Sequence, residues 1–573
     1  MQERRSKLVS IHDAIAQIPD GAKVAIGGSL IRRAPMALVR EIVRQKKKDL
    51  TLYSWSAGMD FDMLIGGGCV KEAWSSYVGL FQLGIAGNFR RAVEQNRIRF
   101  VDISETCGMD KFRAAAYGNS FCISKTPLHS DLLKNPEFKE IVCPFTGEKY
   151  VAMEAFRADY AILHASRADK YGNVQFDTIR MMDNEIDPII AKSAKKVIVS
   201  VEEIVPEEEI IRTPTMTLLP KIFTDQVVHA PFGSHPNSCD TRYDFDLKHG
   251  EYYAECAKSD AGFAEYLNEY IYGTGDEAAY IEKVGGLQAL QASLGHGGDR
   301  RMKKYTLEEL LAVEISKIIR DDEMNFTGIG TGGKAYIRAC GIPLVAVSLA
   351  QMKHAPNAVC MMGPVLDPVL DKDSIPAHNW EYDLIYWPCR AQIPLEDALG
   401  QFRLGKVGLA FASGAQVDKW GNLNITCIGP YDHPKVRFPG CLAQTDLAAY
   451  AKRVCMVVPH TKRVLVDHVD FITSAGHENR EGLPGGGPYR VMTNLAVMDF
   501  NPETRQMRVL TMHEGVTKEM IRDNTGFDIE IPDNVGVTPA PSDEDLRLIR
   551  EVIDPERRFL NAYITSEPAT IDE

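Results

Sequence analysis

Short apolar runs alternate with amphipathic segments along most of the chain. Ala22–Gly28 is typical of a strand, and after it Met36, Val39 and Val43 recur at helical spacing. Further apolar runs lie at 159–165, 195–205, 407–413 and 453–460. Alternation of strands with helices predicts an α/β fold whose sheets are mostly parallel and flanked by helices.

An internal repeat divides the chain into two similar halves. Asp169–Asn173, with sequence DKYGN, recurs as DKWGN at Asp418–Asn422, and the strand opening at 194–197 recurs at 451–454. Each DKxGN segment predicts a turn in which the glycine supplies a positive φ. The strand and helix pattern weakens between 252 and 305, where glycines and basic residues gather. We predict a first domain at 1–280, a linker at 281–304 and a second domain at 305–573.

Composition and charge exclude several classes of protein. Of the 573 residues, 45% are hydrophobic and 25% are charged, as expected for a globular protein rather than a disordered one. The net charge of −13 argues against nucleic acid or an anionic membrane as a partner. The N-terminus is charged where a secretory signal would be apolar, so we expect a cytoplasmic protein.

The twelve cysteines include no Cys-x-x-Cys pair and do not cluster with histidines. We therefore predict no zinc site and no disulfide framework. We also expect no other metal site and no tightly bound cofactor.

Two glycine turns could bind an anion or a developing oxyanion. Gly27, Gly28 and Ser29 follow the first strand, so their amides could face a ligand, although a simple tight turn is an equal alternative. Gly328 and Gly330 open a G-x-G-x-x-G pattern in the second half. The next apolar run does not end in the acid that a dinucleotide site requires, which disfavours NAD binding.

Longer motifs resemble those of a known family. VAIGGSLIRRAPMALVREIV, KEAWSSYVG, NFRRAVE and RADKYGNVQF in the first half resemble the α subunit of glutaconate-type class I CoA-transferases. KHAPNAV, GAQVDKWGNLN, HPKVRFPG and TNLAVMDF in the second half resemble the β subunit. The resemblance implies a fused α and β pair, in which each half is a CoA-transferase-type domain and the substrate is an acyl-CoA thioester. Coenzyme A then enters as part of the substrate.

One position departs from the transferase pattern. In the transferases a glutamate of the β part attacks the thioester, and the matching position here is Met361. A thioether cannot accept an acyl group and pass it on to CoA, so the usual covalent route is disfavoured. CPFTGE, GNLNITCIGPYDHP and YRVMTNLAVMDF instead resemble the ring-opening hydrolase of bacterial steroid C and D ring degradation. That resemblance implies retro-Claisen cleavage of a cyclic β-keto acyl-CoA by water.

The resemblance to this hydrolase assigns the catalytic role to Glu105. The run before Ser104 is typical of a strand, and a helix is predicted from Glu105 to a stop at Gly118. Glu105 would then lie in a first helical turn at the carboxyl end of a strand, where open α/β sheets bind ligands. The helix dipole would also favour a glutamate there for purely structural reasons and would weaken it as a base, unless burial opposes that effect.

Further residues are candidates for binding the substrate. Arg32 and Arg33 could pair with a substrate carboxylate or with the CoA phosphates. Tyr77 and Asn88 could donate hydrogen bonds to the substrate. The backbone of Gly414, Ala415 and Gln416 resembles family positions near the thioester.

Three functions remain in competition. The first is a CoA-ester hydrolase that uses Glu105 as general base, the second is a CoA-transferase acting on a carboxylic acid, and the third is a non-catalytic protein that binds CoA esters. We expect a homo-oligomer in each case, because fusion of two subunits does not prevent association of the fused chains.

Overall fold

The computed structural model describes residues 5–177, 185–239, 241–285, 305–328, 333–370, 374 and 383–560. The chain forms two compact units. The first unit comprises residues 1–295 with 394–396 and 426–443, and the second comprises 296–393, 397–425 and 444–573. The predicted linker at 281–304 remains a prediction, and the sequence pattern did not indicate that the later half contributes the segment 426–443 to the first unit.

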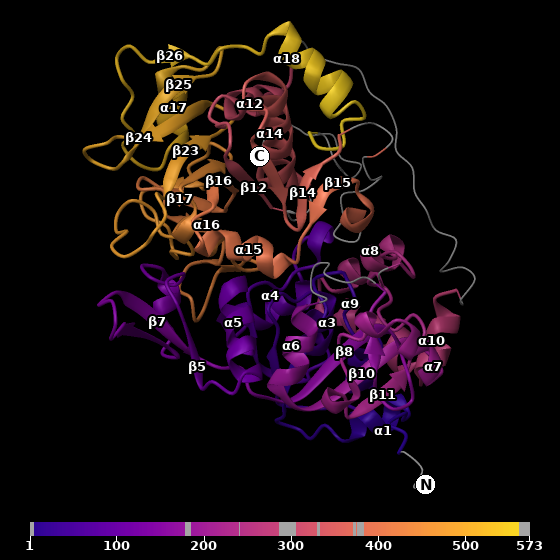
Figure 1. Cartoon of the computed structure of the whole chain (residues 1–573). Coiled ribbons are helices and arrows are strands. Elements are labelled where there is room, and N and C mark those ends of the chain that lie inside the picture. The colour runs from indigo at the N-terminus through magenta and orange to yellow at the C-terminus, as the bar shows by residue number, and fades with distance from the viewer. Residues whose placement is uncertain are drawn as a thin grey trace. The chain divides into compact units, whose positions relative to one another are not determined.

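The first unit is built on a parallel sheet in the order β11-β10-β8-β1-β2-β3-β4, with the short β9 added antiparallel to β8. Figure 1 shows β8, β10 and β11 side by side. The strands are β1 (Lys23–Ile26), β2 (Leu50–Tyr53), β3 (Val70–Ser75), β4 (Arg99–Asp102), β8 (Ala158–Ala168), β9 (Val174–Gln175), β10 (Ala194–Ile204) and β11 (Gln226–His229).

Helices cover both faces of this sheet. The main apolar core joins one face to helices α1 to α4, α8 and α9, while α6 packs on the other face against β8 and β10 and also contacts α5. The helices are α1 (Ile11–Ala16), α2 (Met36–Arg44), α3 (Met59–Gly66), α4 (Gly87–Glu94), α5 (Glu105–Ala116), α6 (Ile186–Ser193), α7 (Glu207–Arg212), α8 (Leu247–Cys256), α9 (Asp260–Leu267) and α10 (Glu277–Lys283).

Two small sheets complete the first unit. One has the order β5-β7-β6 and contacts α5 through β5. The other is the hairpin of β19 and β20 in the segment 426–443, which packs on α4. Their strands are β5 (Phe121–Ser124), β6 (Phe138–Val142), β7 (Lys149–Glu154), β19 (Cys427–Ile428) and β20 (Val436–Arg437).

The second unit has a parallel centre with antiparallel edges. The sheet order is β15-β14-β13-β12-β16-β21-β23-β24-β25-β26, and β13, β12, β16, β21 and β23 run parallel. The strands are β12 (Met324–Thr327), β13 (Val359–Met362), β14 (Val365–Pro368), β15 (Cys389–Gln392), β16 (Val407–Ala412), β21 (Arg453–Val457), β23 (Pro488–Met492), β24 (Ala496–Phe500), β25 (Met507–Met512) and β26 (Gly536–Val537).

Helices α12 and α14 pack together over one face of the second sheet (Figure 1). A further small sheet has the order β18-β17-β22. The remaining elements are α12 (Leu307–Ser316), α13 (Gly333–Tyr336), α14 (Ile342–Lys353), α15 (Leu395–Arg403), α16 (Gln444–Tyr450), α17 (Lys518–Asn524), α18 (Asp543–Arg547), β17 (Gln416–Asp418), β18 (Leu423–Asn424) and β22 (Leu465–Val466). The predicted α/β class with two similar, mostly parallel domains is confirmed.

The repeated DKxGN segment forms the same turn in both units. The Asp169 carboxylate accepts the amides of Tyr171 and Asn173 at 2.9 and 3.0 Å, and Gly172 has φ of 96°. The Asp418 carboxylate accepts the two corresponding amides, each at 3.0 Å, and Gly421 has φ of 76°. The turn predicted from the sequence is therefore confirmed in both places.

Among the described residues, no helix combines the length and the apolar character needed to cross a membrane.

Candidate active site

The carboxyl ends of β2, β3 and β4 bring together polar residues that are distant in sequence. These strands are parallel neighbours, so the residues that follow them lie at one edge of the sheet. Ser54–Ser56 follow β2, Ser76 and Tyr77 follow β3, and Glu105 follows β4. The segments after β2 and β3 remain in contact, because the Ala57 amide donates to the Tyr77 carbonyl at 2.9 Å. This edge is the candidate active site of the first unit.

Glu105 is the first residue of α5, as predicted. The Ser104 side chain caps the helix by accepting the Cys107 amide at 3.2 Å, so Glu105 lies directly at the positive end of the helix dipole. Its side chain is buried, with 8% of the residue exposed. A buried carboxylate at the carboxyl end of a strand suits a base that must act on a water molecule shielded from bulk solvent.

A short strap from the segment 426–443 crosses the ends of β3 and β4. The Pro439 carbonyl accepts the Val78 amide at 2.8 Å, and the Leu442 amide donates to the Ser76 carbonyl at 3.2 Å. The Leu442 carbonyl in turn accepts the Glu105 amide at 3.4 Å. We refer to residues 439–442 as the strap. The strap fixes the backbone on which Glu105 begins.

Gly440 permits this close approach. Its φ is 126°, and a Cβ there would lie 2.3 Å from the Ser76 carbonyl oxygen. A side chain at this position would therefore push the strap away from the end of β3.

Three buried side-chain donors on residues of the same edge have no hydrogen-bond acceptor within the described part of the chain. They are Trp55 Nε1, Ser56 Oγ and the Tyr77 hydroxyl, on residues that are at most 2% exposed. The Trp55 backbone lies against α5, since a Cβ on Gly108 would be 3.3 Å from the Trp55 Cα. An unpaired buried donor costs about 1–3 kcal/mol. These donors could bind the oxygens of a substrate, and the substrate role of Tyr77 remains a prediction. Trp55 and Ser56 were missed because nothing in the sequence SWS shows that their donors are buried without an acceptor.

The first glycine turn holds an internal carboxylate. The Gly28 amide donates to Asp187 Oδ1 at 2.9 Å, and Arg33 pairs with Asp187 Oδ2 at 2.9 Å. Arg33 also donates to the His164 carbonyl at 2.8 Å, and the Ser29 amide donates to the Arg32 carbonyl at 2.9 Å. Asp187 therefore occupies the position predicted for an external anion. A substrate role for Gly27, Gly28, Ser29, Arg32 and Arg33 remains a prediction.

Asn88 is placed in the interior of the first unit. Its amide nitrogen donates to Asp62 at 2.9 Å, and its oxygen accepts from Arg91 at 2.8 Å. Tyr253 also donates to the Asp62 carboxylate, at 2.9 Å. Asn88 therefore links α3 to α4, and its predicted contact with the substrate remains a prediction.

The glycine-rich candidates of the second half are only partly described. Gly328 directly follows β12, whereas Gly330 lies outside the described residues. The Ala415 amide donates to the Asn424 carbonyl at 3.0 Å. The Gln416 side-chain oxygen accepts from Asn424 at 2.7 Å, and its nitrogen donates to Asp470 at 2.6 Å. Gly414, Ala415 and Gln416 thus follow β16 in a segment held by hydrogen bonds, and their contact with a thioester remains a prediction.

Met361 lies inside a central strand of the second sheet. It is fully buried in β13, with Phe326 of β12 and Leu366 of β14 as its neighbours in register. A nearby carboxylate, Asp367, accepts from the Cys360 amide at 2.9 Å and from Gln351 at 3.1 Å. The two residues paired with Met361 across the sheet are thus apolar, and the nearby Asp367 carboxylate already accepts two hydrogen bonds.

His164, Glu202 and Cys239 form a separate buried cluster whose ligand atoms lie within 4.8 Å of one another. His164 contacts Ser200 and Glu202 at 2.9 and 2.7 Å, and Tyr243 also donates to Glu202. Burial alone would raise the pKa of Glu202, but the hydrogen bonds from His164 and Tyr243 lower it. A metal ion would have to displace these bonds, so the cluster is better explained as an internal hydrogen-bond network.

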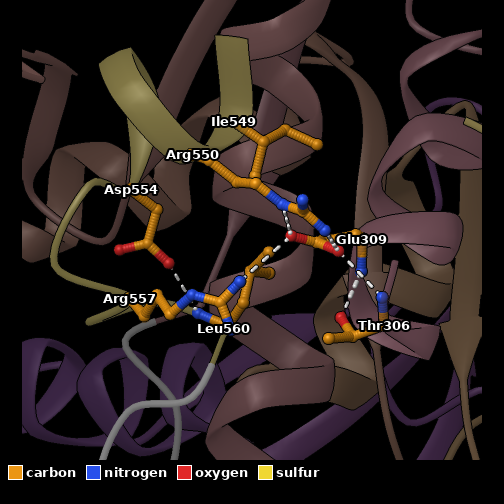
Figure 2. Close-up of a pocket in the computed structure, with 7 residues that line it drawn as sticks. All are labelled: Thr306, Glu309, Ile549, Arg550, Asp554, Arg557 and Leu560. Atoms are coloured by element: carbon orange, nitrogen blue, oxygen red, sulfur yellow. Dashed lines mark hydrogen bonds and ion pairs between the residues drawn. The ribbon is translucent and has the colours of Figure 1, made fainter. Parts of the chain in front are cut away.

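A small pocket in the second unit is lined with charged groups that pair with one another. Figure 2 shows Glu309 facing Arg550 and Arg557. Glu309 receives two hydrogen bonds from Arg550, at 2.7 and 2.8 Å, and forms a capping box with Thr306 at the start of α12. Burial would raise the pKa of Glu309, but Arg550 lowers it. These contacts join the helix at 548–553 to α12, which indicates a structural role.

Comparison with known families gives a match over much of the chain. The family described as Coenzyme A transferase matches residues 8–230 and 401–524. The chain is 33% identical over 311 residues to one subunit of the glutaconate CoA-transferase of Acidaminococcus fermentans, covering 51% of this chain and 96% of that protein. It is 30% identical over 303 residues to the cholesterol ring-cleaving hydrolase IpdA subunit of Rhodococcus jostii, covering 50% of this chain and all of that protein.

Two further proteins are similar to this chain over different shares of their length. An Archaeoglobus fulgidus protein is 35% identical over 293 residues, and the match covers 51% of this chain and only 65% of that protein. The structure of an acyl-CoA transferase from Escherichia coli O157:H7, in a thioester complex with CoA, superposes over 98% of both chains with a TM-score of 0.67 and 16% identity. At that identity the likeness establishes the fold alone.

Proposed function

This chain belongs to the coenzyme A transferase family and is an enzyme that acts on acyl-CoA thioesters, and from that premise we propose that it hydrolyses a carbon–carbon bond in a cyclic β-keto acyl-CoA. The observation that carries the proposal is the position of Glu105. A buried carboxylate lies at the carboxyl edge of the first sheet. The resemblance to the transferases matches their nucleophilic glutamate to Met361, whose thioether is fully buried.

The proposed reaction is a retro-Claisen cleavage. Glu105 removes a proton from water, and the resulting hydroxide attacks the ring ketone carbon. The bond between that carbon and the α carbon of the thioester then breaks, and its electron pair is delocalised as the thioester enolate. Protonated Glu105 returns the proton to the α carbon, which leaves an open-chain carboxylic acid that still carries CoA.

Both oxygen atoms that gain negative charge need hydrogen-bond donors. Trp55 Nε1, Ser56 Oγ and the Tyr77 hydroxyl belong to residues of the same edge as Glu105, and each is a donor without an acceptor among the described residues. Donors that are fixed before the reaction stabilise a developing oxyanion without reorganising, and removal of one such donor costs about 10²- to 10³-fold in kcat. We therefore assign the ketone oxygen to this group of three residues.

CoA transfer to a carboxylic acid is the competing function. It is favoured by the 33% identity to a glutaconate CoA-transferase subunit, which is slightly higher than the 30% identity to the hydrolase subunit. Transfer would need a carboxylate that carries the acyl group and then CoA. The buried thioether of Met361 cannot serve in this way.

The two functions can be separated with one labelled substrate. The purified full-length chain is incubated with 2-oxocyclohexanecarboxyl-CoA in water enriched in oxygen-18, and the products are identified by mass spectrometry. Hydrolysis predicts pimeloyl-CoA with one solvent oxygen in its free carboxylate. Glu105→Gln should abolish this product, whereas Asp110→Asn, on the same helix, should retain it.

A transferase would give a different pattern. It would exchange label between an acyl-CoA and free glutarate, and borohydride would trap a CoA-loaded carboxylate during turnover. Exchange of this kind without solvent oxygen in the product would refute the proposed hydrolysis.

A further inference from the structure

A fully buried ion pair joins the segment 426–443 to the strand that leads into Glu105. Arg437 of β20 pairs with Asp102, the last residue of β4, and each side chain is 1% exposed. Burial disfavours the charged guanidinium, but the Asp102 carboxylate more than compensates and raises the pKa of Arg437. The two residues are separated by more than three hundred positions in the sequence, so their pairing is purely a product of the fold.

Tyr431 completes this contact from the same hairpin. Its hydroxyl lies 2.6 Å from Asp102 Oδ2, and the Asp102 amide donates to that hydroxyl at 3.3 Å. The Arg437 guanidinium lies 4.8 Å from the centre of the Phe100 ring and 5.6 Å from that of Phe89. Both Asp102 oxygens are thereby engaged, and the hairpin is fixed in an apolar setting where solvent cannot screen the pair.

The same segment continues directly into the strap. Arg437 is followed by the residues that bind the ends of β3 and β4, and the Cys441 thiol contacts the Ile103 carbonyl at 3.1 Å. The Leu442 carbonyl then accepts the Glu105 amide. The chain from Asp102 to Glu105 is therefore held at both ends by one segment, through the ion pair at Asp102 and through the strap at Glu105.

We propose that Asp102, Arg437 and Tyr431 are positioning residues that set the place of Glu105 for the reaction. This inference rests on the proposed function, because it assumes that the Glu105 carboxylate does chemistry. A base displaced by about 1 Å can lose about 10²-fold in rate, so a rigid anchor three residues upstream affects turnover without touching the substrate.

The anchoring can be measured without any substrate. Hydrogen exchange of the full chain, followed by mass spectrometry, reports the protection of the Glu105 amide and of the Val78 and Leu442 amides. Arg437→Met should accelerate exchange in these peptides. The double variant Asp102→Asn with Arg437→Met removes both charges, and it keeps the test interpretable if the single variant folds poorly.

A matched control distinguishes anchoring from loss of any buried arginine. Arg40 is also fully buried, pairs with Glu277 and lies 3.8 Å from the centre of the Tyr280 ring. Arg40→Met should therefore destabilise the same unit and leave the protection around Glu105 unchanged. Equal loss of protection in the Arg40 and Arg437 variants would overturn the proposal.

Turnover supplies the second readout. Arg437→Met should lower kcat by about 10- to 100-fold with KM changed less than about threefold, and Arg437→Lys should restore part of the loss.

The two proposals fail in different ways. If Glu105→Gln remains fully active while exchange responds to Arg437→Met, the assigned role of Glu105 fails and the anchor stands as structure alone. If neither exchange nor kcat responds to the variants of Arg437 and Asp102, the positioning role is wrong.

Discussion

Asp187→Asn should strongly destabilise the first unit. In the folded chain the Asp187 carboxylate accepts from the Gly28 amide and from the Arg33 guanidinium, both at 2.9 Å. Arg33 and Asp187 are 1% and 0% exposed at their side chains. Replacement by asparagine keeps the size of the side chain and removes its charge, so Arg33 is left buried without this counter-ion.

The expected cost follows from that burial. Removing one partner of a buried ion pair costs about 3–5 kcal/mol, whereas an exposed pair contributes about 0–1 kcal/mol. Asp159 provides the matched comparison, because it pairs with Lys195 at 2.8 Å while the two side chains are 34% and 76% exposed. Asp159→Asn should therefore cost at most about 1 kcal/mol.

Native-state hydrogen exchange of β1 and β8 measures the opening free energy of the first unit directly. Asp187→Asn should accelerate this exchange by about 10²- to 5 × 10³-fold relative to the wild type, which is the factor that 3–5 kcal/mol gives. Arg33→Met combined with Asp187→Asn should recover part of the loss, because both charges of the buried pair are then removed together. If Asp187→Asn behaves like Asp159→Asn, and Arg33→Met raises only the KM for acyl-CoA, then Arg33 binds substrate and this reasoning is refuted.

Three further predictions concern packing and pH. Gly440→Ala should lower kcat and accelerate hydrogen exchange of the strap, because its Cβ would lie 2.3 Å from the Ser76 carbonyl oxygen. Gly400→Ala in α15 is the control. Its Cβ would meet no atom within 4 Å, so this change should be neutral or stabilising. Burial raises the pKa of Asp418 to about 6, so wild-type stability should fall by about 3 kcal/mol as pH rises from about 4 to 6, and urea unfolding of Asp418→Asn should lack that slope. Burial, with a smaller effect of His513, lowers the pKa of His460 to about 4. The free energy of unfolding should therefore decrease as pH falls from about 6.5 to 4, and it should decrease by about 3 kcal/mol more in the wild type than in His460→Gln.

Local features of the fold could be predicted well from the sequence. The DKxGN turns depend on an aspartate that accepts amides two and four residues ahead, and on a glycine that adopts a positive φ. Glu105 was placed in the first turn of a helix because a strand, a serine cap and an apolar helical face follow one another in the sequence. Each of these signals depends on only a few consecutive residues, so it can be read from the sequence without knowledge of the fold.

Long-range pairings could not be predicted in this way. Asp187 reaches the first glycine turn from a helix that begins far along the chain, and a glycine turn has the same sequence whether it binds an internal carboxylate or an external anion. Arg437 and Asp102 likewise give no local signal of their pairing. Trp55 and Ser56 became candidates only when their buried polar atoms were found without partners among the described residues.

The most direct test of the central claim measures solvent oxygen in the product formed from a cyclic β-keto acyl-CoA by the wild type and by Glu105→Gln. We expect one oxygen-18 atom per ring-opened acid with the wild type and no ring opening with the variant. Full ring opening by Glu105→Gln, or acyl exchange with a free acid and no solvent oxygen, would contradict the proposed hydrolysis.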